Sequence, residues 1–342
     1  MIGFAIPTWN RAEKLRRCVD SLAMQNPSSI YIADNGSDDD TPLVGEELVR
    51  RYPFVEYQRF DEHVPFSESY KRAIQGAKDE YVWTFGDDDK LVPTSYDFIR
   101  NTIKNSTFDF YHVAETTRID RAEGLCGTTF QLSNSLGFID LTGFISGNVM
   151  NTEKMQAVVN SSDWDTYKTS SYPQSLAIMD ATAHNPAMML ELGCIDGGIP
   201  DDGIGQQWLK EDTCWKYLYI ADGLRRLHEK GTLPEKVSET FFRYLEGSLI
   251  HRLVDAFNSR IVFAPQAVSP HDWDCLLYII KMVEGERGDE LLKWAENIKT
   301  VALEETPVFE IFTKSWARLQ AASNGMNMPV YPRAYLPTGE AK

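Results

Sequence analysis

The stretch Tyr81 to Asp89, YVWTFGDDD, decides the fold class because it joins a strand to an acidic run. Its first five residues are all β-branched or aromatic, which predicts a short buried strand. Three adjacent carboxylates repel one another, so they need either water or a cation. Carboxylate oxygens are hard ligands that suit Mg²⁺ or Mn²⁺, with waters and phosphate oxygens as further ligands. The alternative is a solvated turn in which an aspartate caps the helix after Pro93.

Two further units of strand and helix precede this stretch. Ile2 to Ile6 predicts a strand that Pro7 stops, after which Asn10 is expected to cap a helix. Ile30 to Ala33 predicts a second strand, which ends at Asp34 and leads through a turn into another helix. The unit of strand, turn and helix therefore repeats.

A third strand is predicted at Val55 to Tyr57, and Ser67 is expected to cap the helix that leads to Tyr81. Strands that alternate with helices favour an α/β fold with a mostly parallel sheet covered on both faces. Ligands bind to such sheets outside the carboxyl ends of the strands. We therefore expect Thr8, Asp34 and the aspartate run to face one crevice.

Two other acidic segments, Asp34 and Asp38 to Asp40, favour different interpretations. Asp34 can accept a hydrogen bond from a base N–H, which would select a pyrimidine such as uracil. Asp38 to Asp40 stand before a helix, where acids favour the positive end of the helix dipole and Asp40 can act as an N-cap. The sequence contains no GxxxxGK[ST] or GxGxxG motif in this region, which disfavours an ATPase or a dehydrogenase.

Composition narrows the class of protein. The 342 residues carry 34 basic and 50 acidic side chains, a net charge of −16, which disfavours nucleic acid as a partner. The length predicts about two domains, since single cores stop growing near about 250 to 300 residues. No apolar stretch reaches the roughly 20 residues of a membrane span, so membrane contact is expected at most at the periphery.

The N-terminus lacks the features of a signal peptide, and the mature chain is expected to start at Met1. Five cysteines are scattered without a CxxC pair, which argues against a disulfide framework or a structural zinc site. A reducing cytoplasm is the expected location.

Three segments together resemble a known family: IPTWNR (Ile6–Arg11), IADNGSDDDT (Ile32–Thr41) and AIQGAKDEYVWTFGDDD (Ala73–Asp89). Their order and spacing resemble the inverting family 2 glycosyltransferases of the GT-A fold, over about the first hundred residues. FGDDD and SGNVM (Ser146–Met150) further resemble bacterial members that decorate surface polysaccharides, including the abequosyltransferase-like branch.

The resemblance implies roles for individual residues. It implies that Asp34 binds the base, that Asp87 approaches the ribose, and that Asp88 aligns with the last acid of the DxD motif and binds Mn²⁺ or Mg²⁺ at the diphosphate. Asp89 is expected to assist, and Gly86 stands where the family has the first acid. The remaining positions implied near the nucleotide are Pro7, Thr8, Asn10, Arg11 and Asn35.

The catalytic base is less clear, because the family normally supplies it from a Glu-Asp pair at a helix start. The corresponding stretch, SSYPQS (Ser170–Ser175), contains no acid. The candidates, in order of preference, are Asp165, Asp163 and Asp180, with Asp201 and Asp202 as a further alternative on a loop.

We expect three regions: residues 1–110 as the nucleotide-sugar-binding half, 111–225 as the acceptor-binding half, and 226–342 as a helical extension and tail. Apolar residues from Val237 to Leu253 recur every fourth position, which predicts a helix beginning near Pro234. Later helices are predicted at 276–283, 291–298 and 308–319. These helices are candidates for a homo-oligomer contact.

The functional hypothesis is an inverting, metal-dependent transfer of a sugar from a nucleotide-sugar donor, expected to be a UDP-sugar, to a hydroxyl of a glycan or cell-surface polymer. One alternative is a nucleotide-sugar-binding scaffold protein without turnover, which the missing Glu-Asp pair favours. The other is a phage-type glycosyltransferase acting on a modified nucleobase, which the net charge disfavours.

Overall fold

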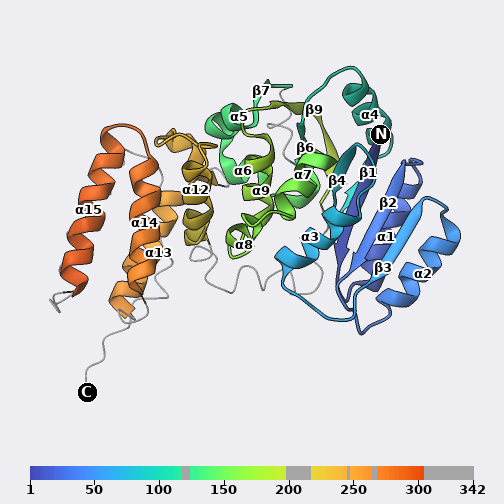
Figure 1. Cartoon of the computed structure of the whole chain (residues 1–342), viewed down its shortest axis with the longest axis horizontal. Coiled ribbons are helices and arrows are strands. Elements are labelled where there is room, and N and C mark those ends of the chain that lie inside the picture. The colour runs from blue at the N-terminus through green and yellow to red at the C-terminus, as the bar shows by residue number, and fades with distance from the viewer. Residues whose placement is uncertain (118–123, 198–216, 245–246, 264–267, 304–342) are drawn as a thin grey trace.

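The computed structural model describes residues 1–117, 124–197, 217–244, 247–263 and 268–303 (Figure 1). Its N-terminal part alternates strands and helices as the sequence predicts. The strands are β1 (Ile2–Thr8), β2 (Ser29–Asp34), β3 (Val55–Arg59) and β4 (Tyr81–Thr84), and the helices between them are α1 (Ala12–Ala23), α2 (Thr41–Arg51) and α3 (Phe66–Gly76).

The middle part completes the sheet with strands of mixed direction. Its strands are β5 (Lys90–Leu91), β6 (Phe110–Glu115), β7 (Cys126–Thr128), β8 (Asn148–Asn151) and β9 (Pro186–Asp196). Its helices are α4 (Ser95–Lys104), α5 (Thr129–Leu136), α6 (Phe138–Thr142), the 3₁₀ turn η2 (Ile145–Gly147), α7 (Thr152–Val159), α8 (Trp164–Tyr167) and α9 (Pro173–Thr182).

The strand order places a switch point beside β1. The order is β3-β2-β1-β4-β8-β6-β9-β5, with β7 paired to β9, and β1 runs parallel to both β2 and β4. The chain thus leaves β1 in one direction to form β2 and returns on its other side to form β4, which opens a crevice at their carboxyl ends. The predicted α/β class is confirmed, as a mixed sheet in which β8 is antiparallel to β4 and to β6.

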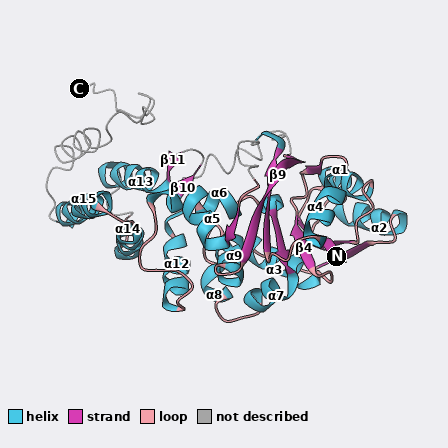
Figure 2. Cartoon of the chain, turned by 90° about the horizontal axis from the view of Figure 1, so that it is seen from above, coloured by secondary structure: helices cyan, strands magenta, loops and turns pink. Residues whose placement is uncertain are grey.

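Two separate cores cover the two faces of the sheet, and Figure 2 shows helices on both sides of it. Phe4 and Ile6 of β1 belong to the core formed with α1, α2 and α4, while Ala5 between them belongs to the core formed with α3, α7 and α9. Alternate side chains of a strand point to opposite faces, so a strand covered on both faces is apolar throughout. This explains the continuous apolar run at the start of the chain.

Pro7 does not stop the first strand, contrary to the sequence prediction. β1 continues to Thr8, and Pro7 pairs with Ala33 of β2. Pairing between β1 and β4 ends at Ala5, so the missing N–H of Pro7 costs no ladder hydrogen bond on that side.

The two predicted helix caps were also wrong. Helix α1 begins at Ala12, and Asn10 instead adopts a left-handed conformation and bonds the loop after β2. Helix α3 begins at Phe66, one residue before Ser67, and Pro65 occupies its N-cap position. Asn tolerates the left-handed region better than most residues, which lets Asn10 serve a turn instead of a cap.

The C-terminal helices lie at the end of the molecule opposite β1–β3 (Figure 1). They are α12 (Ile220–Glu229), α13 (Leu249–Phe263), α14 (Pro270–Met282) and α15 (Glu286–Leu303), with the 3₁₀ turn η3 (Glu239–Phe242) and the short strands β10 (Arg243–Tyr244) and β11 (Gly247–Ser248) before α13. The helices predicted at 276–283 and 291–298 are confirmed, while that at 308–319 lies outside the described residues.

The helix predicted to begin near Pro234 is wrong over its first part. Val237 forms an isolated bridge to Val283, and a 3₁₀ turn and a two-stranded hairpin occupy the chain up to Ser248. Phe241 and Phe242 pack into the core with Phe138, so tertiary packing outweighs the local period. The expected boundary between 225 and 226 falls inside α12. None of the described helices combines the length and the apolar character of a membrane span.

Candidate functional site

A cavity of about 620 Å³ opens at the carboxyl ends of β1 and β4. Its walls come from both halves of the sheet, as expected for a switch-point crevice. The residues that line it are Pro7, Thr8, Trp9, Arg11, Asn35, His63, Val64, Phe66, Ser69, Gly86, Asp87, Asp88, Gly143, Phe144, Ile145, Ser171, Tyr172, Gln174 and Tyr217.

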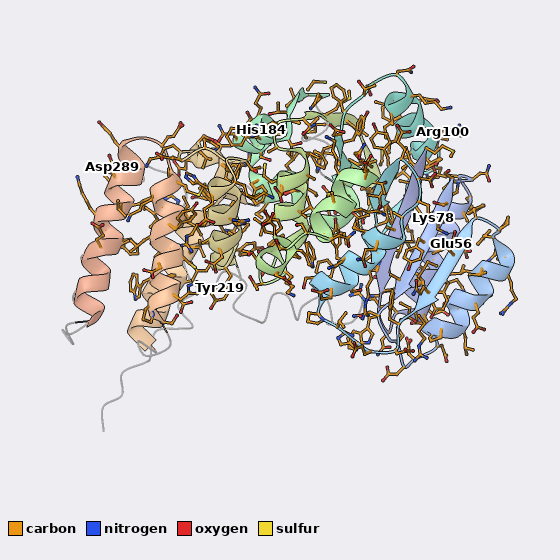
Figure 3. The ribbon with its side chains drawn as sticks, in the orientation of Figure 1. Glu56, Lys78, Arg100, His184, Tyr219 and Asp289 are labelled. Atoms are coloured by element: carbon orange, nitrogen blue, oxygen red, sulfur yellow. The ribbon has the colours of Figure 1, made fainter. Side chains whose placement is uncertain are left out.

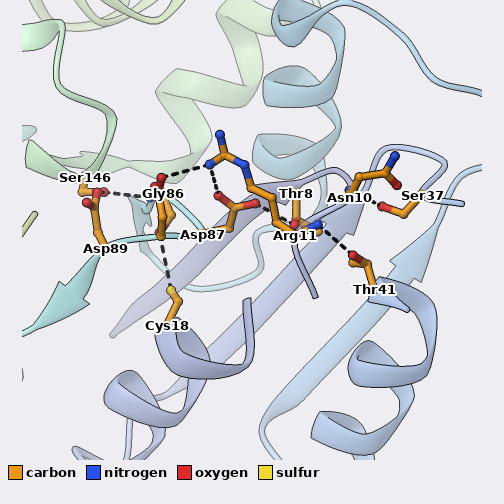
Figure 4. Close-up of polar contacts among 11 residues, drawn as sticks. Thr8, Asn10, Arg11, Cys18, Ser37, Thr41, Gly86, Asp87, Asp89 and Ser146 are labelled. Carbon is orange, nitrogen blue, oxygen red and sulfur yellow. Dashed lines mark hydrogen bonds and ion pairs between the residues drawn. The ribbon is translucent and has the colours of Figure 1, made fainter. Parts of the chain in front are cut away.

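Asp87 and Arg11 form the charged centre of this cavity (Figure 4). Nη1 of Arg11 lies 2.8 Å from Oδ1 of Asp87 and 3.0 Å from Oδ2 of Asp88. The hydroxyl of Thr8 donates to Oδ2 of Asp87 at 2.7 Å, so β1 fixes the second oxygen of this carboxylate. One guanidinium therefore bridges two carboxylates at the strand end where the sequence predicts a cation.

Burial of Asp87 and the positive charge of Arg11 shift the pKa of the Asp87 carboxyl group in opposite directions. Asp87 is 5% exposed, and burial raises the pKa of its carboxyl group, as does the neighbouring charge of Asp88. The Arg11 guanidinium limits that rise, and Asp87 in turn raises the pKa of Arg11. One positive charge shared by two carboxylates leaves about one negative charge at the cavity wall.

Asp89, unlike the other two aspartates, does not line the cavity. Its Oδ2 accepts a hydrogen bond from the hydroxyl of Ser146, and the same hydroxyl oxygen accepts one from the backbone N–H of Gly86. A Cβ atom at Gly86 would lie 2.8 Å from Oδ2 of Asp89 and 3.3 Å from Oδ1 of Asp88. The glycine in place of the family's first acid thus leaves room for the side chain of Asp89.

The arrangement fits one divalent cation. Mg²⁺ is commonly held by one or two carboxylates together with waters and phosphate oxygens, and Asp87 and Asp88 offer that number at the cavity. The bridging nitrogen of Arg11 marks a point between them where positive charge is stable. Asp89 does not line the cavity and bonds Ser146, so its predicted metal role stays a prediction that this geometry does not favour.

Asp34 occupies a different position from the one expected for a base-binding residue. It is fully buried, and its two oxygens accept hydrogen bonds from the backbone N–H of Ser37 and the hydroxyl of Tyr57. Asp34 does not line the cavity, whereas its neighbour Asn35 does. The geometry therefore gives Asp34 a role in shaping the loop after β2, and its predicted contact with a base remains untested.

Asn10 and Asn35 hold the loops around this end of the cavity. The amide of Asn10 bonds Asp38 in both directions, which joins the loop after β1 to that after β2. The side chain of Asn35 donates to the carbonyl of Val64 and accepts from its N–H. Of these two predicted nucleotide-binding residues, only Asn35 lines the cavity, together with Pro7, Thr8 and Arg11.

Two aromatic rings flank the same end of the cavity. Trp9 is 46% exposed, and its ring lies 4.1 Å from that of His63, centroid to centroid. An exposed indole beside an imidazole offers a planar apolar surface on which a nucleobase can stack. Neither residue is predicted from the sequence, although Trp9 lies within the IPTWNR segment.

The opposite wall carries side chains suited to a sugar. The rings of Tyr172 and Tyr217 stack with centroids 5.1 Å apart, and their hydroxyls lie within 2.7 Å of each other. Gln174 is 4% exposed and donates to the carbonyl of Gly143, while its buried Oε1 has no hydrogen-bond partner among the residues that the structure describes. A buried acceptor left unsatisfied at a cavity wall is a ready partner for a ligand hydroxyl.

The three preferred candidates for the catalytic base lie outside this lining. Asp163 accepts hydrogen bonds from Arg226 and Lys230, and Lys230 also bonds Asp180. Asp165 is exposed and pairs with Lys168. Each of these acids is paired with a basic side chain, and none of them lines the cavity. Their role as the catalytic base stays a prediction. Asp201 and Asp202 lie outside the described residues.

Four further residues that the sequence does not predict at the site come from the later part of the chain. Ser146, Tyr172, Gln174 and Tyr217 lie beyond the three segments that resemble the family. Only SGNVM, quoted for its resemblance, and SSYPQS, quoted for its lack of an acid, contain signals that point toward three of them. Neither signal indicates a role.

Comparisons with known proteins agree with this geometry. Residues 4–108 match the family described as glycosyl transferase family 2. Abequosyltransferase RfbV of Salmonella typhimurium is 30% identical over 116 residues, which are 32% of this chain and 34% of that protein. The matched stretch thus spans about a third of the length of this curated relative. The predicted resemblance to family 2 is confirmed.

Solved structures extend the likeness to most of the chain. A TarS structure from S. aureus in complex with UDP-GlcNAc shares 15% identity with a TM-score of 0.58, and the match covers 94% of this chain and 92% of that one. The mannosyltransferase PcManGT from Pyrobaculum calidifontis, in complex with GDP-Man and Mn²⁺, shares 14% identity with a TM-score of 0.52, covering 94% and 86%. The GT-A fold with a helical C-terminal region is confirmed.

Proposed function

We propose, from the premise that residues 4–108 form a family 2 glycosyltransferase domain, that this chain transfers a sugar from a nucleotide-sugar donor to a hydroxyl of a glycan or cell-surface polymer. The observation that carries the proposal is the pair Asp87 and Asp88, held by one arginine at the switch point of the sheet. The name of the Salmonella relative, an abequosyltransferase, supports the transfer of a sugar.

The donor is proposed to lie along the β1 and β2 side of the cavity. Trp9 and His63 would stack on the base, and Asn35 would hold the loop that faces it. The diphosphate would then reach Asp87, Asp88 and Arg11. Solved structures of similar fold carry UDP-GlcNAc and GDP-Man in complexes, and we favour a UDP-sugar by analogy with the first of them.

Asp87 and Asp88 would hold Mn²⁺ or Mg²⁺, and the bound cation supplies charge neutralisation for the departing nucleoside diphosphate. The guanidinium of Arg11 contacts both carboxylates. Beside the diphosphate, Arg11 would add its positive charge to that of the cation. Thr8 fixes one oxygen of Asp87, which limits the orientations of that carboxylate. These residues would therefore act on the leaving group.

The acceptor side is proposed to use Gln174, Tyr172 and Tyr217. The free Oε1 of Gln174 would accept a hydrogen bond from a sugar hydroxyl, and the stacked tyrosines would contact an apolar sugar face. An inverting displacement also needs a base on the face of the sugar opposite the leaving group. The acids among the described lining residues are Asp87 and Asp88, which belong to the leaving-group side.

That distribution of acids supports a second candidate function, a nucleotide-sugar-binding protein without turnover. Both functions predict donor binding and differ only in bond cleavage. Slow hydrolysis of the donor in the absence of acceptor separates them, because a binding protein releases no free sugar.

The test is a binding and hydrolysis panel with the full chain. UDP, GDP, CMP and TDP are added with and without Mn²⁺ to record thermal stabilisation, and the corresponding nucleotide sugars are added to record release of free sugar, for the wild type and for Asp88→Asn. We expect one nucleotide to stabilise the wild type in a Mn²⁺-dependent manner and to lose that effect in Asp88→Asn. Stabilisation by no nucleotide would overturn the proposal, and binding without Mn²⁺-dependent sugar release would favour the second candidate.

A further inference from the structure

We propose that Asp222 of α12 together with His271 and Cys275 of α14 forms a binding site for a zinc-class transition-metal ion. The site lies among the C-terminal helices and shares no residue with the cavity that the transferase proposal uses. It therefore stands or falls independently of that proposal.

Three different ligand atoms converge at this place. Nε2 of His271 lies 3.0 Å from Oδ2 of Asp222 and 3.6 Å from Sγ of Cys275, and Sγ lies 4.0 Å from Oδ1 of Asp222. Zinc bonds of about 2.0 to 2.3 Å at a tetrahedral angle place nitrogen and sulfur ligands roughly 3.6 Å apart, and nitrogen and oxygen roughly 3.3 Å apart. The nitrogen–sulfur and nitrogen–oxygen separations thus match two edges of a tetrahedral site, and the three ligand atoms all lie within 4.8 Å of one another.

The same geometry argues against a catalytic relay of cysteine, histidine and aspartate. In such a relay the two ring nitrogens of the histidine contact different partners. Here one nitrogen, Nε2, faces both the thiol and the carboxylate. Two groups that approach one imidazole nitrogen are placed to surround a cation, because the proton of that nitrogen can satisfy only one of them.

The ligand types select the class of metal. A thiolate with an imidazole suits zinc and related transition metals, whereas Mg²⁺ and Ca²⁺ prefer sets made of oxygen atoms alone. Cys275 is fully buried, while the side chain of His271 is 54% exposed, so the ion can enter past the histidine. Water can occupy the fourth position on that open side.

Neighbouring side chains orient the proposed ligands. Arg225 donates to Oδ1 of Asp222 at 2.9 Å, which leaves Oδ2 to face His271. The ring of Tyr219 is nearly parallel to that of His271, at 11° with centroids 6.1 Å apart. Tyr219, at the start of α12, is labelled in Figure 3. Hydrogen bonds and packing of this kind commonly fix the ligands of a metal site.

A metal at this position would tie the C-terminal helices to the rest of the chain. His271 and Cys275 are one helical turn apart on α14, whereas Asp222 belongs to α12, which in turn bonds Asp163 beside α8 through Arg226. The sequence prediction against a structural zinc site rests on the lack of CxxC spacing. The proposed ligands are 49 residues apart in sequence between Asp222 and His271, and only the fold brings them together.

The test measures zinc and cobalt binding by the full chain after removal of metals. A chromophoric chelator competes for Zn²⁺, and Co²⁺ reports a thiolate ligand by its charge-transfer absorption. We expect one tight Zn²⁺ equivalent in the wild type and at least about a tenfold loss of affinity in His271→Gln and in Asp222→Asn. The cobalt–thiolate band should disappear in Cys275→Ser.

Matched controls separate this site from other ligands in the chain. His184→Gln removes an exposed histidine after α9, labelled in Figure 3, and Cys126→Ser removes an exposed cysteine on β7; neither residue belongs to the proposed site. Both should bind Zn²⁺ as the wild type does, and so should Asp88→Asn, which disables the proposed donor site. Equal Zn²⁺ affinity in the wild type and His271→Gln would overturn the proposal. Since His271 is exposed, this variant tests the site even if Cys275→Ser fails to fold.

Discussion

Two pairs of aspartates in this molecule each share one basic side chain, but the surroundings of the pairs differ. Asp87 and Asp88 share the single guanidinium of Arg11 at a cavity wall. Asp163 and Asp180 both pair with Lys230, and Asp163 also pairs with Arg226. None of these four residues lines the cavity. The first pair retains negative charge beside space for a ligand, whereas the second is neutralised within the protein. Asp87 and Asp88 are therefore the better candidates for function, because they line a cavity and share only one basic side chain.

The largest expected effect comes from removing charge from the first pair. Asp88→Asn should lower Mn²⁺-dependent donor hydrolysis at least about a hundredfold, since metal stabilisation of a leaving group contributes several kcal/mol. The matched control is Asp165→Asn, which removes an exposed, ion-paired acid and should stay within about twofold of the wild type. The measurement is sugar release at saturating Mn²⁺. A hundredfold loss in Asp165→Asn would instead support this residue as the base and break the comparison.

The next effect concerns stability and the second pair. Lys230→Met leaves Asp180, whose side chain is 4% exposed, without its cation and should cost about 2 kcal/mol of unfolding free energy, less than the 3–5 kcal/mol for a fully buried pair because Lys230 is partly exposed. Lys168→Met, at an exposed pair with Asp165, should change the stability much less, because solvent screens exposed ion pairs. Urea unfolding gives both values. Similar costs for the two lysines would show that the cluster of Asp163 and Asp180 carries no special stability.

A smaller effect is expected at the opposite wall of the cavity. Gln174→Leu removes the free acceptor Oε1 and should lower kcat/KM about fivefold, the value of a neutral hydrogen bond of about 1 kcal/mol. Mn²⁺ affinity should not change, because Gln174 has no contact with Asp87 or Asp88 among its hydrogen bonds. Kinetics with varied acceptor concentration measure the first quantity, and metal titration measures the second. Weaker Mn²⁺ binding would contradict the division of the cavity into two sides.

The smallest effect is a pH dependence of stability at Asp163. Burial alone raises the pKa of this carboxyl group, but hydrogen bonds from Lys230 and Arg226 outweigh burial and hold the pKa below its ordinary value. A depressed folded-state pKa contributes stability that is present above the unfolded pKa, about 3.9, and is lost as pH falls through the folded value. The stability difference between the wild type and Asp163→Asn should thus be constant near pH 7 and shrink below about pH 4. A difference that grows on acidification would reverse the assignment.

The N-terminal half of the fold can be predicted from the local sequence pattern, whereas the candidate site can be predicted from that pattern only in part. Strands β1, β2 and β4 are buried on both faces, so short apolar runs such as Ile30 to Ala33 predict them directly. Their order places Asp87 near Thr8, as expected. The sequence does not predict that Asp34 is fully buried by Tyr57 and Ser37, because those contacts depend on how a neighbouring strand and a turn close over it.

The acceptor side and the C-terminal region are harder for a different reason. Tyr172 and Tyr217 are 45 residues apart and meet by stacking, which no local period encodes. Likewise, the spacing of apolar residues from Val237 to Leu253 predicts a helix. Phe241 instead lies in a 3₁₀ turn and packs on Phe138. In both places long-range packing decides the outcome, and propensity is only a weak guide.

Gly86 also restricts the order in which this sequence can change. A side chain at position 86 would meet Oδ2 of Asp89 at 2.8 Å, so an acid introduced there first would collide with the carboxylate that Ser146 holds. A route from GDDD toward a motif with an acid at position 86 must therefore shorten or remove Asp89 before it replaces the glycine. The two substitutions are epistatic: Gly86→Asp is expected to be damaging in the present chain and tolerated after Asp89→Ala.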